Sequence, residues 1–287
     1  MYDQKENELS EKDTKTIGVV DIGSNSTRLS IYRCENGSSR LLLNKKKMTG
    51  LAQYVKNGVL TREGIREAVG AVRSFKQLLF NLDVREMYIF ATASLRNVSN
   101  SFEAAKAIED AVGVKVDVIS GEEEGDLSFY GAMRSVSIKT GMLIDLGGGS
   151  TEIVHFEGGR ITESYSLPLG SLSLFRQYVS GLWPENEELS LMKKAVKAQL
   201  NEQETEYTPA EDICGVGGTV RAVCRLVNEV YNRPEDCREF TFDELESIYR
   251  IIKKGGSERK KLLIKIVPDR LHTIMPGIVI LRTIMKT

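Results

Sequence analysis

The chain has 287 residues, enough for two medium-sized domains that each bury a core of their own. Its 39 basic and 40 acidic residues give a formal net charge of −1, so no global positive field recruits a nucleic acid, and any anion site must be local. Only two histidines are present and the four cysteines form no CxxC pair, which disfavours histidine-based catalysis and a zinc centre.

The first 15 residues are polar and lack the apolar core of a secretion signal, so we expect a flexible tail and a cytoplasmic protein. The longest apolar run, 274–281, contains Pro276 and is too short to cross a bilayer. The sequence therefore predicts neither a membrane nor a nucleic acid as a partner, and it leaves a homodimer open.

The first half of the chain shows strand and helix patterns in the order β-β-β-α-β-α-β-α, which is typical of a ribonuclease-H-like unit. Strands are expected at 19–32 (a hairpin), 39–44, 87–92 and 114–119, and helices at 61–82, 100–113 and 121–136. Asn100 and Glu103 form a capping-box pattern at the start of the second helix. We therefore expect a first domain at 16–136.

The second half begins with another hairpin pattern and continues with more helices. Strands are expected at 143–156, 161–166 and 213–216, and helices at 171–180, 187–203, 220–231, 257–266 and 269–286. A further helix begins at a capping box formed by Thr241 and Glu244 and ends at Gly255. These elements predict a second α/β domain at 137–287.

One stretch of the sequence occurs twice. Residues 19–32 read VVDIGSNSTRLSIY, and 143–156 read LIDLGGGSTEIVHF, at a constant offset of 124 that carries Asp21 onto Asp145. Each copy is typical of a β-hairpin whose Gly/Ser turn can point successive backbone N–H groups at an anion. Ordinary hairpins would explain a single copy. The matched pair favours two related domains that each contribute one phosphate-binding turn to a shared cleft.

Six motifs, in order, carry a resemblance to a known family: VDIGSNSTR (20–28), ATASLRNVSN (91–100), VISGEEEG (118–125), DLGGGSTE (145–152), LPLGSLSL (167–174) and GVGGT (215–219). They resemble the exopolyphosphatase / guanosine pentaphosphatase family of the actin, hexokinase and Hsp70 superfamily. The resemblance implies two duplicated ribonuclease-H-like domains with an interdomain cleft. It also implies Mg²⁺-dependent release of terminal phosphate from a small polyanionic substrate, either inorganic polyphosphate or guanosine pentaphosphate.

The candidate substrate-binding residues lie in three glycine-containing turns. They are Gly23, Ser24, Asn25 and Ser26; Gly147, Gly148, Gly149, Ser150 and Thr151; and Gly217, Gly218 and Thr219. The third turn stands at a predicted strand-to-helix junction, where free N–H groups can face an anion, but GGT alone is a weak signal.

Charged residues beside the hairpin turns complete the predicted site. Asp21, Asp145 and Glu152 are candidate ligands of Mg²⁺, with Mn²⁺ as a substitute, because hydrolysis of a phosphoanhydride needs the phosphate charge neutralised. Arg28 begins the outgoing strand of the first hairpin, where its guanidinium can bind an anion. A plain ion pair between Arg28 and Glu152 is the alternative.

The resemblance assigns two further catalytic residues. It selects Glu124 of the GEEEG run as the base that activates water, with Glu123 as the alternative, since only one of three consecutive helical glutamates can face the site squarely. It makes Arg96, expected in a polar loop, a second phosphate-binding arginine, whereas a surface or capping role is the alternative. A non-catalytic sensor of the same anions and a kinase-like transferase are competing functions, and the intact acidic residues favour the enzyme.

The sequence departs from the family pattern in two places. Gly50-Leu51-Ala52 stands where the family often has Arg-Leu-Gly, with Lys45, Lys46 and Lys47 just before it. The last strand of the family, with its Gly-x-Arg-Glu-Gly motif, and the C-terminal helical domain do not appear. We therefore expect short polyanions to suit the site better than a long polyphosphate track.

Overall fold

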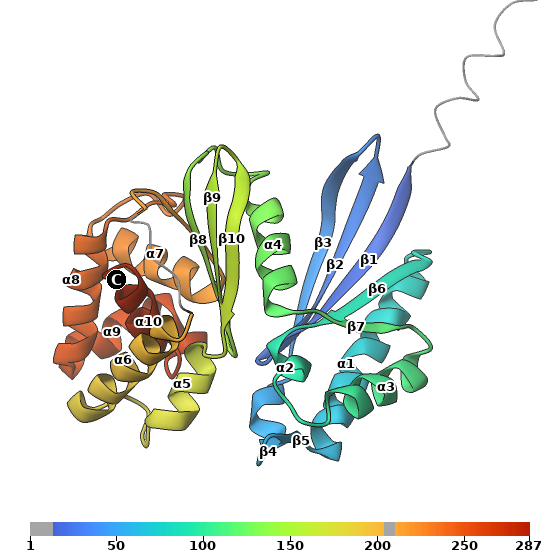
Figure 1. The fold of residues 1–287 in the computed structure, drawn as a ribbon, viewed down its shortest axis with the longest axis horizontal. Coiled ribbons are helices and arrows are strands. Elements are labelled where there is room, and N and C mark those ends of the chain that lie inside the picture. Colours follow the sequence, from blue (N-terminus) through green and yellow to red (C-terminus); the bar gives the residue numbers. More distant parts are fainter. Residues whose placement is uncertain (1–13, 204–209) are drawn as a thin grey trace, which may run out of the picture. The chain divides into compact units, whose positions relative to one another are not determined.

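The computed structural model of the chain describes residues 14–203 and 210–287. It contains two compact units, unit 1 (Met1–Ile119) and unit 2 (Ser120–Thr287) (Figure 1). Most of the tail predicted at 1–15 lies outside the described residues, and Lys15 already belongs to the first strand. Within the described ranges, no helix combines the length and the apolar character needed to cross a membrane.

Unit 1 is built on a five-stranded sheet in the order β3-β2-β1-β6-β7. The strands β1 (Lys15–Ile22), β2 (Ser26–Glu35) and β3 (Ser38–Met48) form an antiparallel meander. The strands β6 (Glu86–Ala91) and β7 (Val116–Val118) continue the sheet in parallel beyond β1. Parallel neighbours need a crossover connection. The helices of unit 1 supply it.

Two long helices cover one face of this sheet. They are α1 (Arg62–Asn81) and α3 (Ser101–Val112), and the short α2 (Ala93–Arg96) follows β6. Alternate residues of β1 and β2 point at the helices and form one buried cluster with them, which includes Val20, Leu29, Phe75 and Ile108. A short connection between β3 and α1 holds η1 (Leu51–Tyr54), β4 (Val55–Lys56) and β5 (Val59–Leu60).

The predicted capping box at the start of α3 is wrong. The side chain of Asn100 makes no cap hydrogen bond. Its amide instead binds the backbone of Leu60, accepting from the N–H at 2.9 Å and donating to the carbonyl at 3.0 Å. A long-range partner has therefore displaced the local one, and α3 is held to the β5 strand.

Unit 2 contains a four-stranded sheet in the order β10-β9-β8-β11. The strands β8 (Gly141–Leu146), β9 (Thr151–Glu157) and β10 (Arg160–Leu167) are antiparallel, and β11 (Ile213–Val216) runs parallel to β8. Among the described residues, β10 and β11 are the two edge strands of this sheet. The first four strands of the unit 1 sheet follow the same order.

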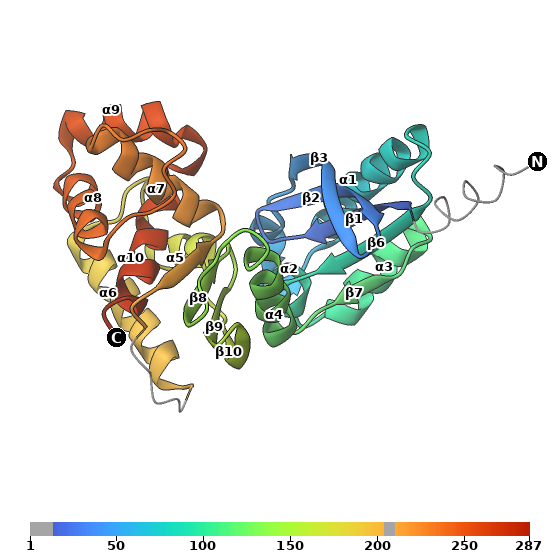
Figure 2. The same cartoon turned by 90° about the horizontal axis from the view of Figure 1, so that it is seen from above.

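The two faces of the unit 2 sheet are covered by different helices (Figure 2). One face packs against α4 (Gly121–Ala132), where Phe129 joins Leu143 and Val154 in a small core. The other face packs against a large helical layer, through residues such as Ile144 and Ile153. Asp145 and Glu152 have the parity of Leu143 and Val154 in their strands, and so they lie on the α4 face.

The helical layer consists of α5 (Ser171–Tyr178), α6 (Asn186–Asn201), α7 (Gly218–Val230), α8 (Phe242–Lys254), α9 (Gly256–Ile266) and α10 (Ile274–Ile284). At its centre, α10 packs against four of these helices. The capping box at Thr241 and Glu244 is confirmed at the start of α8.

Two predicted boundaries differ from the structure. The domain boundary expected between residues 136 and 137 moves to the junction before α4, because α4 packs against β9 and β10 of unit 2. The single helix expected at 269–286 is a short turn, η2 (Pro268–Arg270), followed by α10. Pro276 lies within the first turn of α10, where the missing N–H has no helical acceptor to lose.

Candidate active site

The two hairpins share one turn geometry. The amide of Gly23 donates to the carbonyl of Ser26 at 3.1 Å, and the amide of Gly147 donates to the carbonyl of Ser150 at 3.1 Å. A Cβ atom on either glycine would lie 3.0 or 3.1 Å from that same carbonyl, which leaves little room for a side chain. The correspondence predicted at an offset of 124 is therefore confirmed at the level of the hairpin backbone.

In unit 1, the segment after β3 holds the turn from behind. The amides of Gly50 and Ala52 donate to the carbonyls of Asn25 and Ser24, each at 2.9 Å. A trans peptide points its C=O and N–H in opposite directions. The N–H of Asn25 therefore faces away from this segment, and it has no acceptor among the described residues. Gly50-Leu51-Ala52, the departure from the family pattern, thus orients the turn through its backbone.

In unit 2, the start of α5 plays the same part. The amides of Leu172 and Ser173 donate to the carbonyl of Gly148 at 2.9 and 3.0 Å. By the same peptide geometry the N–H of Gly149 faces away from α5, again without an acceptor in the described part of the chain. A Cβ on Gly170 would lie 2.5 Å from the carbonyl carbon of Gly148, so α5 approaches closely only because residue 170 is glycine.

Helix α4 lies close to β9 and β10 because two glycines, one turn apart, face the strands. A Cβ on Gly121 would lie 2.2 Å from the Cβ of Ser166, and one on Gly125 would lie 2.9 Å from the Oγ of Ser164. This close approach brings Glu124 near the strands. It also places Ser128, one turn later, so that its hydroxyl donates to the Oδ2 of Asp145.

Three carboxyl groups gather on this face of unit 2. Asp145 and Glu152 are direct neighbours across the β8–β9 ladder, and Glu152 is only 1% exposed. Burial, followed by the charge of Glu124, raises the pKa of Glu152 to about 8, although Ser166 donates to its Oε1 at 2.8 Å. Burial also raises the pKa of Asp145, against the opposing effects of Ser128 and Arg221. Such a cluster is costly unless a cation or a proton neutralises it.

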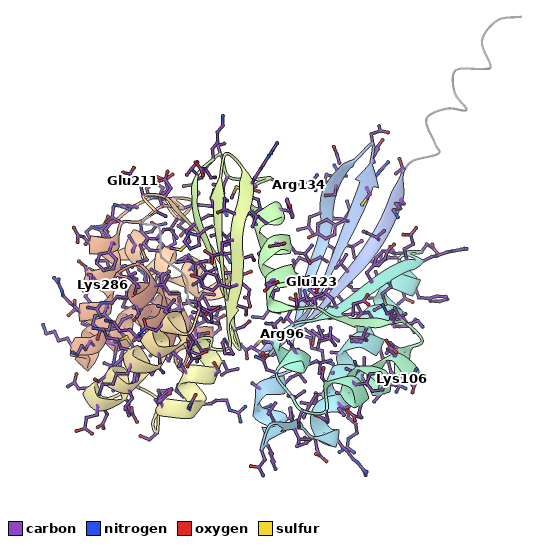
Figure 3. The ribbon with its side chains drawn as sticks, viewed as in Figure 1. Arg96, Lys106, Glu123, Arg134, Glu211 and Lys286 are labelled. Carbon is purple, nitrogen blue, oxygen red and sulfur yellow. The ribbon has the colours of Figure 1, made fainter. Side chains whose placement is uncertain are left out.

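The structure separates the two glutamates that the sequence left as alternatives. Glu123, labelled in Figure 3, closes a capping box at the start of α4: its Oε2 accepts from the amide of Ser120 at 2.7 Å. Glu124 instead acts on Glu152 electrostatically. Glu123 thus has a helix-capping role, and Glu124 is the glutamate that belongs to the carboxyl cluster.

The third turn adjoins the same carboxylates. Gly217 has φ +98°, and a Cβ there would lie 2.5 Å from the carbonyl oxygen of Leu146 and 3.3 Å from the Oδ1 of Asp145. The guanidinium of Arg270 lies over Gly218, where a Cβ would be 2.0 Å from its Nη2. Arg270 therefore brings a positive charge to the GGT turn. The sequence did not predict this role for Arg270. The only related signal is Gly218, about 50 positions earlier, which leaves room for the guanidinium.

Two of the predicted binding residues turn their side chains into the protein. The hydroxyl of Thr151 donates to the carbonyl of Leu169 at 2.8 Å, and Thr219 packs so closely on α10 that a Cβ on Gly277 would lie 2.3 Å from its methyl carbon. Both threonines are at most 1% exposed. They hold the turns in place, and only their backbone can face a ligand.

In unit 1, the predicted arginines are both anchored. Arg28 is the ladder neighbour of Asp21, and its Nη1 donates to the Oδ1 of Asn44 at 3.1 Å. Arg96 ends the short helix α2, and the polar loop predicted there is wrong (Figure 3). Its Nη1 donates to the carbonyl of Ile119 at 3.2 Å. Each guanidinium thus has a neutral oxygen of its own unit among its partners.

Among the described residues, no group of three or more histidine, cysteine, aspartate or glutamate side chains is arranged to hold a metal ion by itself. Asp145 and Glu152 form a two-carboxylate pair in unit 2, and Asp21 belongs to unit 1. A cation held here would need ligands from water or substrate.

Comparison with known proteins decides the family. A family model described as the Ppx/GppA phosphatase family matches residues 30–287. The chain belongs to the Ppx/GppA phosphatase family. It is 24% identical over 279 residues to exopolyphosphatase 1 of Mycobacterium tuberculosis, which covers 94% of the chain and 81% of that protein.

Solved structures of the Ppx/GppA family support the fold. The crystal structure of the Aquifex aeolicus family member superposes with a TM-score of 0.77 at 26% identity, over 95% of this chain and 90% of that one. An exopolyphosphatase from Cytophaga hutchinsonii shares the fold, with a TM-score of 0.80 at 19% identity and the same coverage, 95% and 90%. The predicted α/β class with an actin-like fold is confirmed. The chain is a phosphoanhydride hydrolase of the Ppx/GppA family. Whether its two domains are duplicates stays a prediction.

Proposed function

We propose that this Ppx/GppA family member releases the terminal phosphate of inorganic polyphosphate, as an exopolyphosphatase. The observation that carries the proposal is the carboxyl cluster of Glu124, Asp145 and Glu152 beside the Gly149 amide. Hydrolysis of a phosphoanhydride needs little more than donors for the phosphate oxygens, a cation to neutralise their charge and a base to orient water. Unit 2 supplies donors and carboxylates for each of these needs.

Glu124 is the proposed base. Helix α4 holds it beside the strands through Gly121 and Gly125, so its position is fixed by backbone packing. A bound phosphate would add negative charge beside it, and like charge improves a carboxylate as a proton acceptor. The amide of Gly149 and the guanidinium of Arg270 are the proposed donors to phosphate oxygens. Arg28 and Arg96 of unit 1 are the further phosphate-binding residues that we propose.

Mg²⁺ is the proposed cofactor, and the donor set fits it. Burial raises the pKa of both Asp145 and Glu152, and a divalent cation would relieve these two buried carboxylates. Mg²⁺ commonly takes one or two protein carboxylates and completes its shell with water and phosphate oxygens. Bound there, Mg²⁺ would neutralise charge on the phosphate being transferred. Asp145 and Glu152 would hold it, and Asp21 stays a predicted additional ligand.

The substrate assignment follows the relatives named as exopolyphosphatases in Mycobacterium tuberculosis and Cytophaga hutchinsonii. Guanosine pentaphosphate remains the second candidate, because it carries the same terminal phosphoanhydride. A sensor that binds without hydrolysis would not need a carboxylate base, Glu124, beside the buried Glu152. The acidic cluster therefore supports the enzyme.

The test is phosphate release by the purified full chain from tripolyphosphate, long-chain polyphosphate, guanosine pentaphosphate and ATP, with Mg²⁺ and with excess chelator. We expect turnover of polyphosphate that depends on Mg²⁺. Turnover confined to guanosine pentaphosphate would reassign the substrate. Tight polyphosphate binding without turnover would favour the sensor, and full activity in excess chelator would remove the metal.

A further inference from the structure

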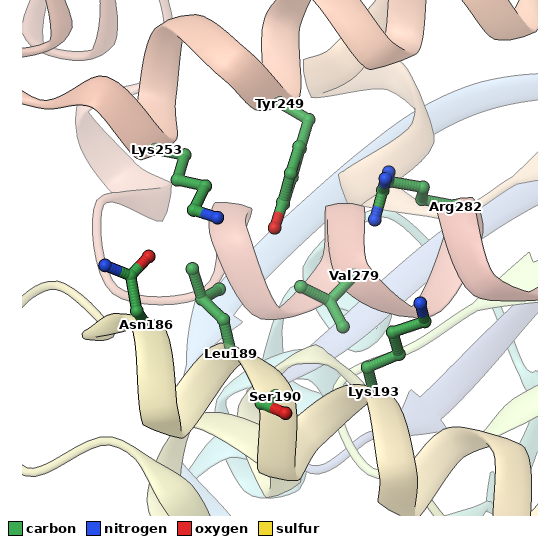
Figure 4. A pocket seen from close by; sticks show the side chains of 8 residues that line it. All are labelled: Asn186, Leu189, Ser190, Lys193, Tyr249, Lys253, Val279 and Arg282. Carbon is green, nitrogen blue, oxygen red and sulfur yellow. The ribbon is translucent and has the colours of Figure 1, made fainter.

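Unit 2 also has a pocket lined by basic side chains. It lies in the helical layer, on the opposite side of the sheet from the carboxyl cluster. A cavity of about 300 Å³ lies between α6, α8 and α10 (Figure 4). Its lining includes Ser190, Lys193, Tyr249, Lys253, Val279 and Arg282, which we call the α10 pocket. These helices cover the sheet face opposite to α4. A ligand in the α10 pocket therefore cannot touch Glu124.

Positive charge dominates the α10 pocket. Lys193, Lys253 and Arg282 line it from three different helices, and none of its lining residues is acidic. Glu246 binds Arg282 through two nitrogens and also lies 3.3 Å from Lys286, so this single carboxylate is already shared. Neither Lys193 nor Lys253 has an ion pair in the described part of the chain. Like charges around one cavity repel each other unless an anion joins them.

The donors converge on the mouth of the cavity. In Figure 4 the hydroxyl of Tyr249 points down between Lys253 on one side and the Lys193 and Arg282 side chains on the other. The guanidinium of Arg282 lies 4.3 Å from the Tyr249 ring centre, and this contact fixes the ring. Burial raises the pKa of Tyr249, so its hydroxyl stays protonated and can donate. Within the described residues, that hydroxyl has no hydrogen-bond partner.

The size and the chemistry of the cavity limit its ligand. About 300 Å³ is at the small end for ligand pockets, which suits a compact anion. Arg282 already covers the ring of Tyr249, which disfavours stacking of a nucleobase there. Lys193, Lys253 and the Tyr249 hydroxyl, next to the Arg282 guanidinium that Glu246 already pairs, instead match the oxygens of linked phosphates, since ammonium groups form charge-assisted hydrogen bonds with them.

We propose that the α10 pocket binds the diphosphate or triphosphate group of a small anion, as a second phosphate site separate from the active site. The anion is either a short inorganic polyphosphate or a nucleoside phosphate held by its phosphates. Binding there holds a phosphorylated ligand on unit 2 without exposing it to the carboxyl cluster.

The test uses methylenediphosphonate, a non-hydrolysable diphosphate, in calorimetric titrations of the full chain. The variant Lys193→Gln/Lys253→Gln removes both lysines that lack an ion pair, and both positions are exposed, so the fold tolerates the change. The matched control is Lys194→Gln/Lys254→Gln, which alters the next residue on each helix and the same net charge. We expect one binding event to weaken by roughly tenfold or more in the pocket variant and to persist in the control.

Two results would overturn the proposal. The first is a titration of the pocket variant that is unchanged from wild type. The second is an equal loss of affinity in both double variants, which would indicate an effect of diffuse surface charge only. Any binding event that remains in the pocket variant is assigned to the active site. If no such event remains, the result counts against the proposed function and does not affect the proposal for the α10 pocket. A parallel titration with adenosine 5′-methylenediphosphonate distinguishes a nucleoside phosphate from an inorganic polyphosphate as the ligand. Tighter binding than methylenediphosphonate supports a nucleoside phosphate, and equal or weaker binding supports the inorganic anion.

Discussion

The β1–β2 hairpin of unit 1 and the β8–β9 hairpin of unit 2 share a turn geometry and carry opposite charges at one position. Both turns close with a 3.1 Å hydrogen bond from the first glycine, and both have carbonyls held from behind by amides. Opposite the aspartate, however, unit 1 places Arg28 and unit 2 places Glu152. We propose that the turn backbone sets where an anion binds, and that the residue opposite the aspartate decides whether the turn binds the anion directly or through a cation.

The largest expected effect concerns the acidic hairpin. Asp145→Asn removes one of two carboxylates proposed to hold Mg²⁺, so we expect phosphate release to fall by about 10³-fold or more and Mn²⁺ binding, measured by electron paramagnetic resonance, to be lost. Asp21→Asn, measured beside it, tests the predicted third ligand. Retained Mn²⁺ binding in Asp145→Asn would remove this residue from the metal site.

The basic hairpin should act on substrate affinity. Arg28→Gln removes a guanidinium proposed to bind phosphate oxygens, so KM should rise about 10- to 100-fold, as expected for one or two charge-assisted hydrogen bonds. Arg33→Gln is the matched control, since Arg33 lies on the same strand and pairs with Glu35 at 3.7 Å. Steady-state kinetics give the result, and equal KM values for Arg28→Gln and wild type would contradict the role.

A smaller effect is expected from the packing that positions Glu124. The Cβ of Gly125→Ala would press on Ser164 and Val154, at 2.9 and 3.1 Å, and we expect a loss of about 1–3 kcal/mol in the free energy of unfolding with lower kcat. Gly131→Ala, on the same helix, meets open space and should gain about 0.5–1 kcal/mol. Denaturant titrations of both variants test this. An unaltered Gly125→Ala protein would show that α4 can shift freely.

The smallest effect is a dependence of thermal stability on pH. The folded pKa of Glu152, raised to about 8 first by burial and then by Glu124, exceeds its unfolded value, so the folded state binds more protons between pH 4.5 and about 8. This contribution to stability is complete below the unfolded pKa and is lost as pH rises through the folded pKa.

The metal-free Tm should therefore fall by several degrees across this range, and Glu152→Gln should flatten the fall. Mg²⁺ should raise the Tm of wild type at the alkaline end more than that of Glu152→Gln. Differential scanning calorimetry measures both. A wild-type Tm that rises with pH over this range, with Glu152→Gln rising in parallel, would contradict the raised pKa.

Local patterns predicted much of the fold. The two hairpins, the strand at Ile213–Val216 and the capping box at Thr241 follow from alternation and from short-range hydrogen bonds, so the sequence alone was sufficient. The GEEEG run predicted a helix start for the same reason. The two glycines of this run also set the distance of α4 from β9 and β10, which only the packing in the structure shows.

The remainder depended on contacts far apart in the chain. Asn100 hydrogen-bonds to the backbone of Leu60 and does not cap its own helix. Arg270, which follows α9 in the chain, contacts Gly218. Helix α4 joined unit 2, although its sequence follows unit 1 without a break. These contacts form because the partner that is distant in sequence gives the lower free energy in the folded structure. The periodicity of the sequence carries no information about such partners.

We propose above all that the carboxyl cluster of unit 2 performs hydrolysis with Glu124 as its base. The most direct measurement compares phosphate release from tripolyphosphate by Glu124→Gln and Glu123→Gln at saturating Mg²⁺. Glutamine at position 123 can still cap α4. We expect Glu124→Gln to lose about 10²- to 10⁴-fold in kcat and still bind substrate, while Glu123→Gln stays near wild type. Near-normal turnover by Glu124→Gln would contradict the account.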